Sequence, residues 1–127
     1  MRTLSFVFVL LMSAFVLAAC GDADVAGDPS DTVIDYLEAK IAADEDALSG
    51  LLCADMEADL AREANSFTGV ADARLEGATC TFDEDSNIVT CEGAIVANYG
   101  QEDTEFPLTS YNVVQDDGEW KWCGVAG

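Results

Sequence analysis

The hydrophobic pattern of this chain changes its period once, near Arg74, and that change limits the folds open to it. Before Arg74, apolar residues recur at helical spacing, as on one face of an amphipathic helix. After Arg74, apolar and polar residues alternate, as in strands with one buried face. Helices followed by neighbouring strands predict an α+β domain in which the helices pack on one face of an antiparallel sheet.

Acidic residues mark where the predicted helices begin. Asp28 precedes Pro29, a residue that suits the first helical turn, so we expect a first helix over residues 29–43. A break at Asp44-Glu45-Asp46 separates it from two further helical segments, over about residues 46–53 and 55–66. The core-facing residues of these helices are expected to be Val33, Leu37, Ile41, Leu48, Leu51, Leu52, Met56, Leu60 and Ala64.

The alternating half of the chain predicts four strands in an antiparallel meander. Turn-forming residues separate them at 83–87, 100–103 and 116–118, and each turn is short enough for a hairpin. The predicted strands are Leu75–Phe82, Ile88–Tyr99, Thr104–Gln115 and Glu119–Val125.

Pairing the strands outward from these turns assigns their residues to two faces. The predicted core face carries Phe82, Val89, Cys91, Ile95, Phe106, Leu108, Cys123 and Val125. The other face carries Val96, Tyr111, Val113, Trp120 and Trp122, which is more apolar than a solvated face should be. Two interpretations stay open: a one-residue register shift or bulge turns the tryptophans inward, or Tyr111, Trp120 and Trp122 form an aromatic surface for a protein partner or a homodimer.

The N-terminal segment has the three parts of a secretory signal. Arg2 supplies a positive start, and an apolar run from Leu4 to Leu17 follows. This run is shorter than the roughly 20 apolar residues that span a bilayer. Its end, LAAC at residues 17–20, resembles a bacterial lipobox, which implies a lipid on the Cys20 sulfur and cleavage before Cys20.

Three segments are therefore expected: a lipoprotein signal peptide (residues 1–19), a lipidated Cys20 with a flexible acidic tether (20–28), and a single α+β domain (29–127). The lipid would hold the domain at the cell membrane or cell envelope, on the extracytoplasmic side. Ordinary secretion and an uncleaved anchor are the alternatives.

Four cysteines remain when Cys20 is assigned to the lipid, and an even number in an exported domain predicts two disulfides. Three connectivities exist. The 83–87 turn would set Cys80 opposite Cys91 across a hairpin, which favours that pair and leaves Cys53 for Cys123. The chain-entropy model assigns the longer closure about 4 kcal/mol of stabilisation.

The charge excludes some classes of partner. The chain has 25 acidic and 5 basic residues, a net charge of −20, which repels nucleic acid and anionic lipid headgroups. The loop Asp83–Asn87 has acids at alternate positions like a calcium loop, but Ile88 and Ala94 stand where such a loop needs Gly and Glu. The chain has no histidine and no C-x-x-C pair, so we expect no metal site and no cofactor.

The stretch Val33–Val125 resembles the nuclear-transport-factor-2-like superfamily. Residues 33–39 are similar to its first helix, the break at 44–46 with residues 51–53 to its second, and residues 117–123 (DGEWKWC) to its last strand. It looks closest to small bacterial lipoproteins built on this fold. The resemblance implies a curved, cystatin-like sheet wrapped around a long helix, with a pocket at the wide end of the cone and often a dimer through the sheet.

The sequence favours a lipid-anchored binding or interaction domain. The alternative is an acid–base enzyme like the ketosteroid-isomerase and polyketide-cyclase types, which needs a pocket carboxyl group with a raised pKa. No motif identifies such a carboxyl group, and no catalytic residue is assigned. Tyr36 and Tyr99 are candidates to point inward, where a tyrosine hydroxyl is normally hydrogen-bonded. A third hypothesis is cation capture by the acidic surface.

Overall fold

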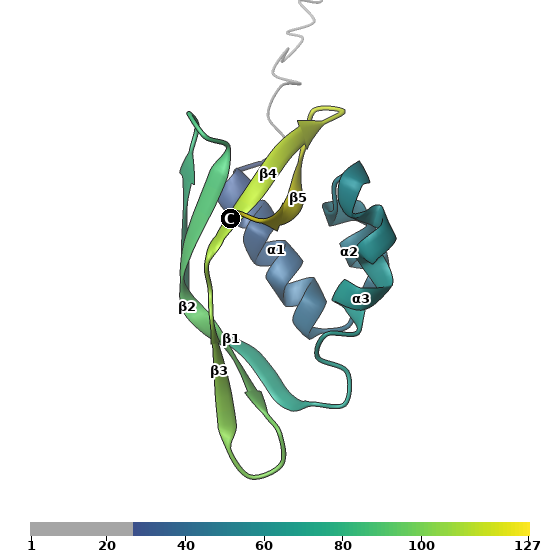
Figure 1. Ribbon diagram of the computed structural model, residues 1–127, viewed down its shortest axis with the longest axis vertical. Coiled ribbons are helices and arrows are strands. Elements are labelled where there is room, and N and C mark those ends of the chain that lie inside the picture. Colours follow the sequence, from purple (N-terminus) through teal and green to yellow (C-terminus); the bar gives the residue numbers. More distant parts are fainter. Residues whose placement is uncertain (1–26) are drawn as a thin grey trace, which may run out of the picture.

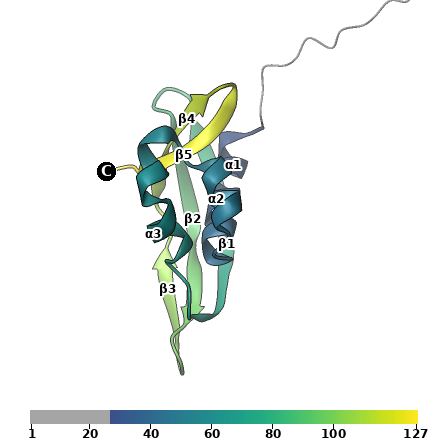
Figure 2. The same cartoon turned by 90° about the vertical axis from the view of Figure 1, so that its right-hand side faces the viewer.

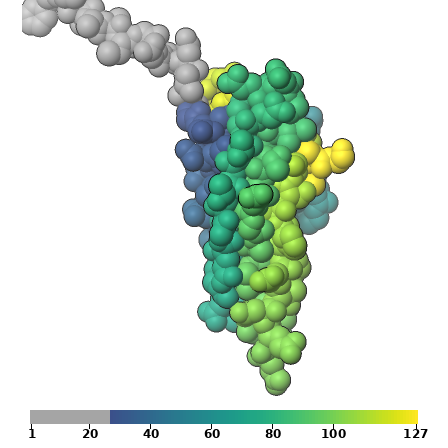
Figure 3. Space-filling view, turned by 90° about the vertical axis from the view of Figure 1, so that its left-hand side faces the viewer, coloured from purple at the N-terminus to yellow at the C-terminus, as the bar shows by residue number. Residues whose placement is uncertain are grey.

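The computed structural model describes residues 27–127, so the signal peptide, Cys20 and most of the tether lie outside the described residues. Four helical elements come first: α1 (Pro29–Ile41), α2 (Glu45–Leu51), the 3-10 helix η1 (Ala54–Asp59) and α3 (Leu60–Ala64). Five strands follow: β1 (Ala71–Asp83), β2 (Ile88–Asn98), β3 (Asp103–Pro107), β4 (Ser110–Asp116) and β5 (Glu119–Val125). The helices cover one face of the sheet (Figures 1 and 2), which confirms the α+β class. Within residues 27–127 no helix covers the opposite face, over which β1, β2 and β3 are exposed (Figure 3).

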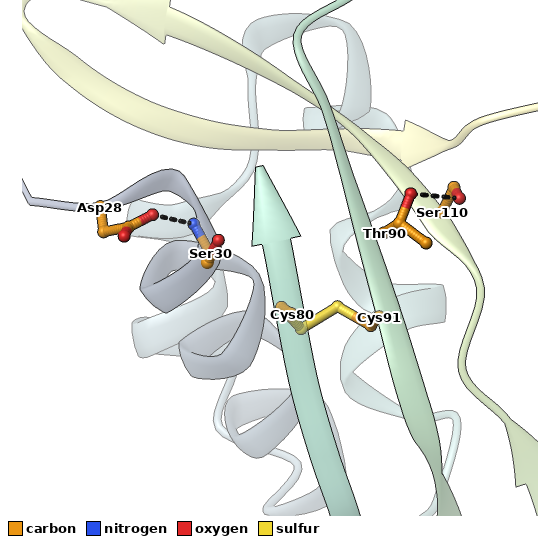
Figure 4. The surroundings of a disulfide bond; sticks show 6 residues. All are labelled: Asp28, Ser30, Cys80, Thr90, Cys91 and Ser110. Carbon is orange, nitrogen blue, oxygen red and sulfur yellow. Dashed lines mark hydrogen bonds between the residues drawn. A yellow bond between two sulfur atoms is a disulfide. The ribbon is translucent and has the colours of Figure 1, made fainter. Parts of the chain in front are cut away.

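The first two helices begin where the acidic residues predict, whereas the third predicted segment, residues 55–66, is divided into η1 and α3. The Asp28 carboxylate accepts a hydrogen bond from the backbone N–H of Ser30 at 2.8 Å (Figure 4), and Asp44 accepts one from Ala47 at 3.0 Å. Each bond satisfies one of the free N–H groups of a first helical turn. The first helix ends two residues earlier than expected, because Ala43 adopts a left-handed conformation with φ of 54°.

The third predicted strand is broken in two, so the sheet has five strands rather than four. Its first half, β3, pairs with the end of β2, from Ala94 to Asn98. Its second half, β4, pairs with the beginning of β2, from Ile88 to Thr90, and the sheet order is β1-β2-β4-β5.

The break between β3 and β4 corrects the predicted faces of the sheet. Phe106 lies opposite Ile95 and Tyr111 lies opposite Val89, and both β2 residues are buried in the core. In an unbroken strand, residues five apart would point to opposite faces. The irregular pair Leu108-Thr109 reverses the alternation, so Tyr111 turns inward.

Of the two open interpretations, the aromatic surface at Tyr111, Trp120 and Trp122 is therefore wrong. Tyr111 is 6% exposed and Trp122 is 2% exposed, and both belong to the core beneath the helices. Trp120 is half-buried against Phe82, with ring centroids 5.2 Å apart. The structure agrees with the other interpretation, in which an irregularity turns the tryptophans inward.

Two disulfides join the same pairs that the spacing favoured. Cys80 and Cys91 lie opposite each other on β1 and β2 (Figure 4), with Cα atoms 4.1 Å apart. Cys53 and Cys123 link the segment between α2 and η1 to β5, with Cα atoms 5.3 Å apart. The backbone N–H of Cys53 also donates to the Trp122 carbonyl at 2.9 Å, so the helical layer is fastened to β5 twice within two residues.

Gly93 allows β1 and β2 to approach closely at a bulge. The register of the two strands shifts between Glu76 and Thr79, opposite Gly93. Gly93 has φ of +104°, and a Cβ atom there would lie 2.6 Å from the carbonyl oxygens of both Glu76 and Gly77. The contacts are with backbone, so a side chain could fit only if a strand moved.

We expect Gly93→Ala to lower the free energy of unfolding by at least about 2 kcal/mol, because strained φ and the backbone clash act together. Gly50→Ala is the matched control: Gly50 lies within α2, has ordinary helical φ, and a Cβ atom added to it would meet no other atom within 4 Å. That control should gain about 0.5–1 kcal/mol. Denaturant unfolding measures both, and equal stability of the two variants would contradict the bulge.

Candidate functional site

The main candidate site is a half-open groove between the helical layer and the sheet, with a volume of about 470 Å³. We call it the Glu63 groove. Of the eight aromatic residues in the described part of the chain, five line it. These are Tyr36, Phe67, Phe106, Tyr111 and Trp122. Pockets of this size and lining are typical of small-molecule sites.

Glu63 forms the polar centre of the groove. Among residues 27–127 it is the only buried charged residue, at 6% exposed. The Tyr36 hydroxyl donates to its Oε2 atom at 2.5 Å, and Lys40 Nζ donates to the same atom at 2.7 Å. Lys40 Nζ also lies 3.2 Å from the Tyr36 hydroxyl, and Arg62 approaches Glu63 Oε1 at 3.4 Å. The buried carboxylate is therefore paired on both oxygens.

Helical spacing brings these groups together. Tyr36 and Lys40 are four residues apart on α1, so their side chains share one face of that helix. Glu63 lies on α3, three residues after Leu60, on the side of the helix that meets the core. Packing of α3 beside α1 then closes the network over 27 residues of sequence.

The network keeps the Glu63 carboxyl group ionised. Burial favours its neutral form, but hydrogen bonds from Lys40 and Tyr36, with the charge of Lys40 and a contact from Arg62, outweigh burial and hold its pKa below the usual value. The pKa of Tyr36 is raised, first by burial and then by its hydrogen bond to Glu63. At neutral pH the pair is a carboxylate and a neutral phenol, and Glu63 has no proton to donate.

Trp122 forms the wall of the groove on the sheet side. Its ring stacks on Tyr36, with centroids 3.9 Å apart and planes 11° apart. The Nε1–H group is buried and has no hydrogen-bond partner among the described residues. A buried N–H donor without an acceptor costs about 1–3 kcal/mol of folding stability. No described residue supplies an acceptor to Trp122.

The structure brings together some residues that the sequence singled out and separates others. Tyr36 points inward with its hydroxyl hydrogen-bonded, as expected, whereas Tyr99 is 57% exposed. Trp122 and Tyr111 line the groove, and Trp120 does not. The four disulfide cysteines are outside the groove, and Cys20 is outside the described residues.

Sequence reasoning missed Glu63 and Lys40, although the pattern held a signal for each. Glu63 falls in the apolar stripe of Leu60, Ala64 and Phe67, which faces the core, and an acid is rarely buried there unless a basic group pairs with it. Lys40 follows Val33, Tyr36 and Leu37 at helical spacing, on the face expected to be buried. One buried acid and one basic residue on neighbouring helices predict an ion pair.

Two other pockets of the described chain, of about 550 and 750 Å³, contain no buried charged side chain. In residues 27–127 no group of three or more metal-ligating side chains is placed to hold a metal ion, the acidic loop 83–87 included. Within the same residues no helix is both long and apolar enough to cross a bilayer.

No protein-family model, curated protein or solved structure matches this chain.

We expect Glu63→Gln to lower the free energy of unfolding by about 1–3 kcal/mol at pH 7, because the half-buried Lys40 ammonium loses its partner. Glu57→Gln is the matched control, since Glu57 precedes Glu63 on the same segment and is exposed. Denaturant unfolding of both variants measures the difference. If the two changes cost the same, the network does not stabilise the fold.

The cost of Glu63→Gln should also depend on pH. A carboxyl group with a lowered folded-state pKa stabilises the fold above its unfolded pKa, here about 4.5, and loses that contribution as the pH falls through the lower folded value. The difference between the parent chain and Glu63→Gln should therefore be constant from pH 7 to about pH 5 and shrink in more acidic solution. A difference that grows on acidification would contradict the assignment.

Proposed function

We propose that this chain is a lipid-anchored binding domain that works outside the cytoplasm and holds its ligand in the Glu63 groove. The observation that carries the proposal is an aromatic groove whose charged wall groups are each paired with one another. Such a wall can hold a ligand through apolar contact area and complementary shape, as most small-molecule binding sites do.

Two features support the location. The LAAC segment at residues 17–20 resembles a lipobox, and a lipid on Cys20 would anchor the domain. The disulfides Cys53–Cys123 and Cys80–Cys91 are of a kind that persists in oxidising compartments and is rare in the cytosol.

The architecture supports the resemblance to the nuclear-transport-factor-2-like superfamily. The helices lie on one face of an antiparallel sheet, and β4 and β5 cross above α1 at an angle to β1 and β2 (Figure 1). In the proposed cone, α1 lies inside the curved sheet and the Glu63 groove is its pocket. The fold hosts both enzymes and binding modules, so it does not decide between them.

The chemistry of Glu63 favours binding over acid–base catalysis. A general acid or base at neutral pH needs a pKa moved toward 7. The neighbours of Glu63 move its pKa the other way, and both of its oxygens already accept hydrogen bonds. A ligand in the groove would therefore meet a Glu63 carboxylate whose oxygens are already hydrogen-bonded, in part to residues of α1.

The position of the groove suits an anchored binding domain. The chain enters α1 at Pro29, beside the β4–β5 turn, and the β2–β3 hairpin lies at the other end of the molecule (Figure 1). Lys40 and Phe106 place the groove toward that hairpin end. Tyr36, the first residue of α1 that lines the groove, lies seven residues after Pro29, so about 10 Å of helix separates the near edge of the groove from the start of α1.

We expect Cys20→Ala to release the protein from membranes, because no sulfur remains for the lipid. Fractionation of cells into membrane and soluble pools, with and without detergent, measures this. Ser13→Ala is the matched control, since it alters the same leader and leaves the cysteine. A Cys20→Ala chain that still needs detergent for release would overturn the anchor.

A further inference from the structure

We propose that the Glu63 groove takes a neutral, flat and largely apolar molecule that carries a hydrogen-bond acceptor. The inference rests on the proposed binding function and names the chemical class of the ligand. Three observations carry it: the aromatic walls, the charge balance of the polar groups and the unpartnered Trp122 N–H.

The walls of the groove suit a flat ring. Tyr36 and Trp122 already stack face to face, and Phe67 meets Phe106 edge to face with ring centroids 5.8 Å apart. The stack and the edge-to-face pair both line the same groove of about 470 Å³. Aromatic side chains favour other rings in stacked or edge-on contact, so a planar ligand would gain most from Phe106, which is 38% exposed, and less from Tyr36 and Trp122, whose rings cover each other.

The charges of the groove leave no partner for a charged ligand. Lys40 pairs with Glu63 at 2.7 Å, and Arg62 pairs with Asp59 at 3.0 Å and with Glu63 at 3.4 Å. An anion would have to displace these acids and approach a chain of net charge −20. A cation would meet Lys40 and Arg62 at the wall. Because an unpaired charge is costly to remove from water, a neutral molecule fits best.

Trp122 adds a polar requirement to this apolar site. Its ring lines the groove and its buried Nε1–H has no acceptor among the described residues. A carbonyl or hydroxyl oxygen would supply that acceptor on a ligand that displaces the atoms covering Nε1 as it enters. Sites of this kind fix the orientation of an apolar ligand with a small number of placed polar groups.

The test compares three probes that share one ring system and differ in charge: naphthamide, naphthoate and naphthylmethylammonium. Each is titrated into the full chain, labelled with nitrogen-15 and held in a detergent micelle. The indole N–H resonance of Trp122 reports binding, and that of Trp120, outside the groove, is the internal reference. Equilibrium dialysis gives the free concentration of each probe, which removes the effect of partition into the micelle.

We expect naphthamide to shift the Trp122 resonance with a dissociation constant at least about tenfold lower than those of the two charged probes, with Trp120 unmoved. Thr109→Phe, which places a ring at the groove wall, should weaken naphthamide binding by about tenfold or more. Thr79→Phe, the same change on the exposed outer face of β1, should leave it unaltered.

A charged probe that moves Trp122 with a dissociation constant as low as that of naphthamide overturns the neutral class and leaves the binding function standing. Failure of all three probes to move Trp122 overturns both. The ranking of probes on the unsubstituted chain decides between these outcomes even if Thr109→Phe does not fold.

Discussion

The helical layer is fastened to the sheet through β5, at Trp122 and Cys123. The Trp122 ring stacks on Tyr36 of α1, and its carbonyl accepts a hydrogen bond from Cys53. The next residue, Cys123, is bonded to the same Cys53. Stacking, a backbone hydrogen bond and a covalent link thus act within two residues. Because Tyr36 also donates to Glu63, this junction fixes the groove as well as the core.

The few basic residues are placed where the fold needs them. In residues 27–127 each of the four forms an ion pair: Lys40 and Arg62 at the groove, Arg74 with Glu76 and Asp103 on the sheet, and Lys121 with Glu119. Exposed pairs contribute little in water. The pair at Glu63 differs because its carboxylate is buried, so removing one partner leaves a charge without compensation. In the proposed binding site, the same pairing leaves no unpaired charge at Lys40 or Glu63 for a charged ligand.

Local patterns predicted much of the fold because their causes are local. Asp28 and Asp44 cap helices through side-chain oxygens that reach the next turn, a rule that needs no tertiary contact. The hairpin turn at 83–87 set Cys80 opposite Cys91 by register alone. The prediction of a single strand over Thr104–Gln115 was wrong. Its two halves, β3 and β4, pair with different parts of β2, and the break between them depends on that pairing. One irregular pair of residues then reversed the face of every aromatic residue beyond it.

The sequence by itself determined the α+β class, the positions of the helix starts and turns, and the pairs of cysteines within reach. Those follow from periodicity, capping and hairpin geometry, which act over a few residues. Only the tertiary structure decided that Trp122 faces the helices and that Glu63 meets Tyr36 and Lys40. Glu63 is 23 residues from Lys40, and a contact at that separation depends on the packing of whole helices against a sheet. The groove is formed by that packing, so the chemistry of the site emerged only when the two layers were joined.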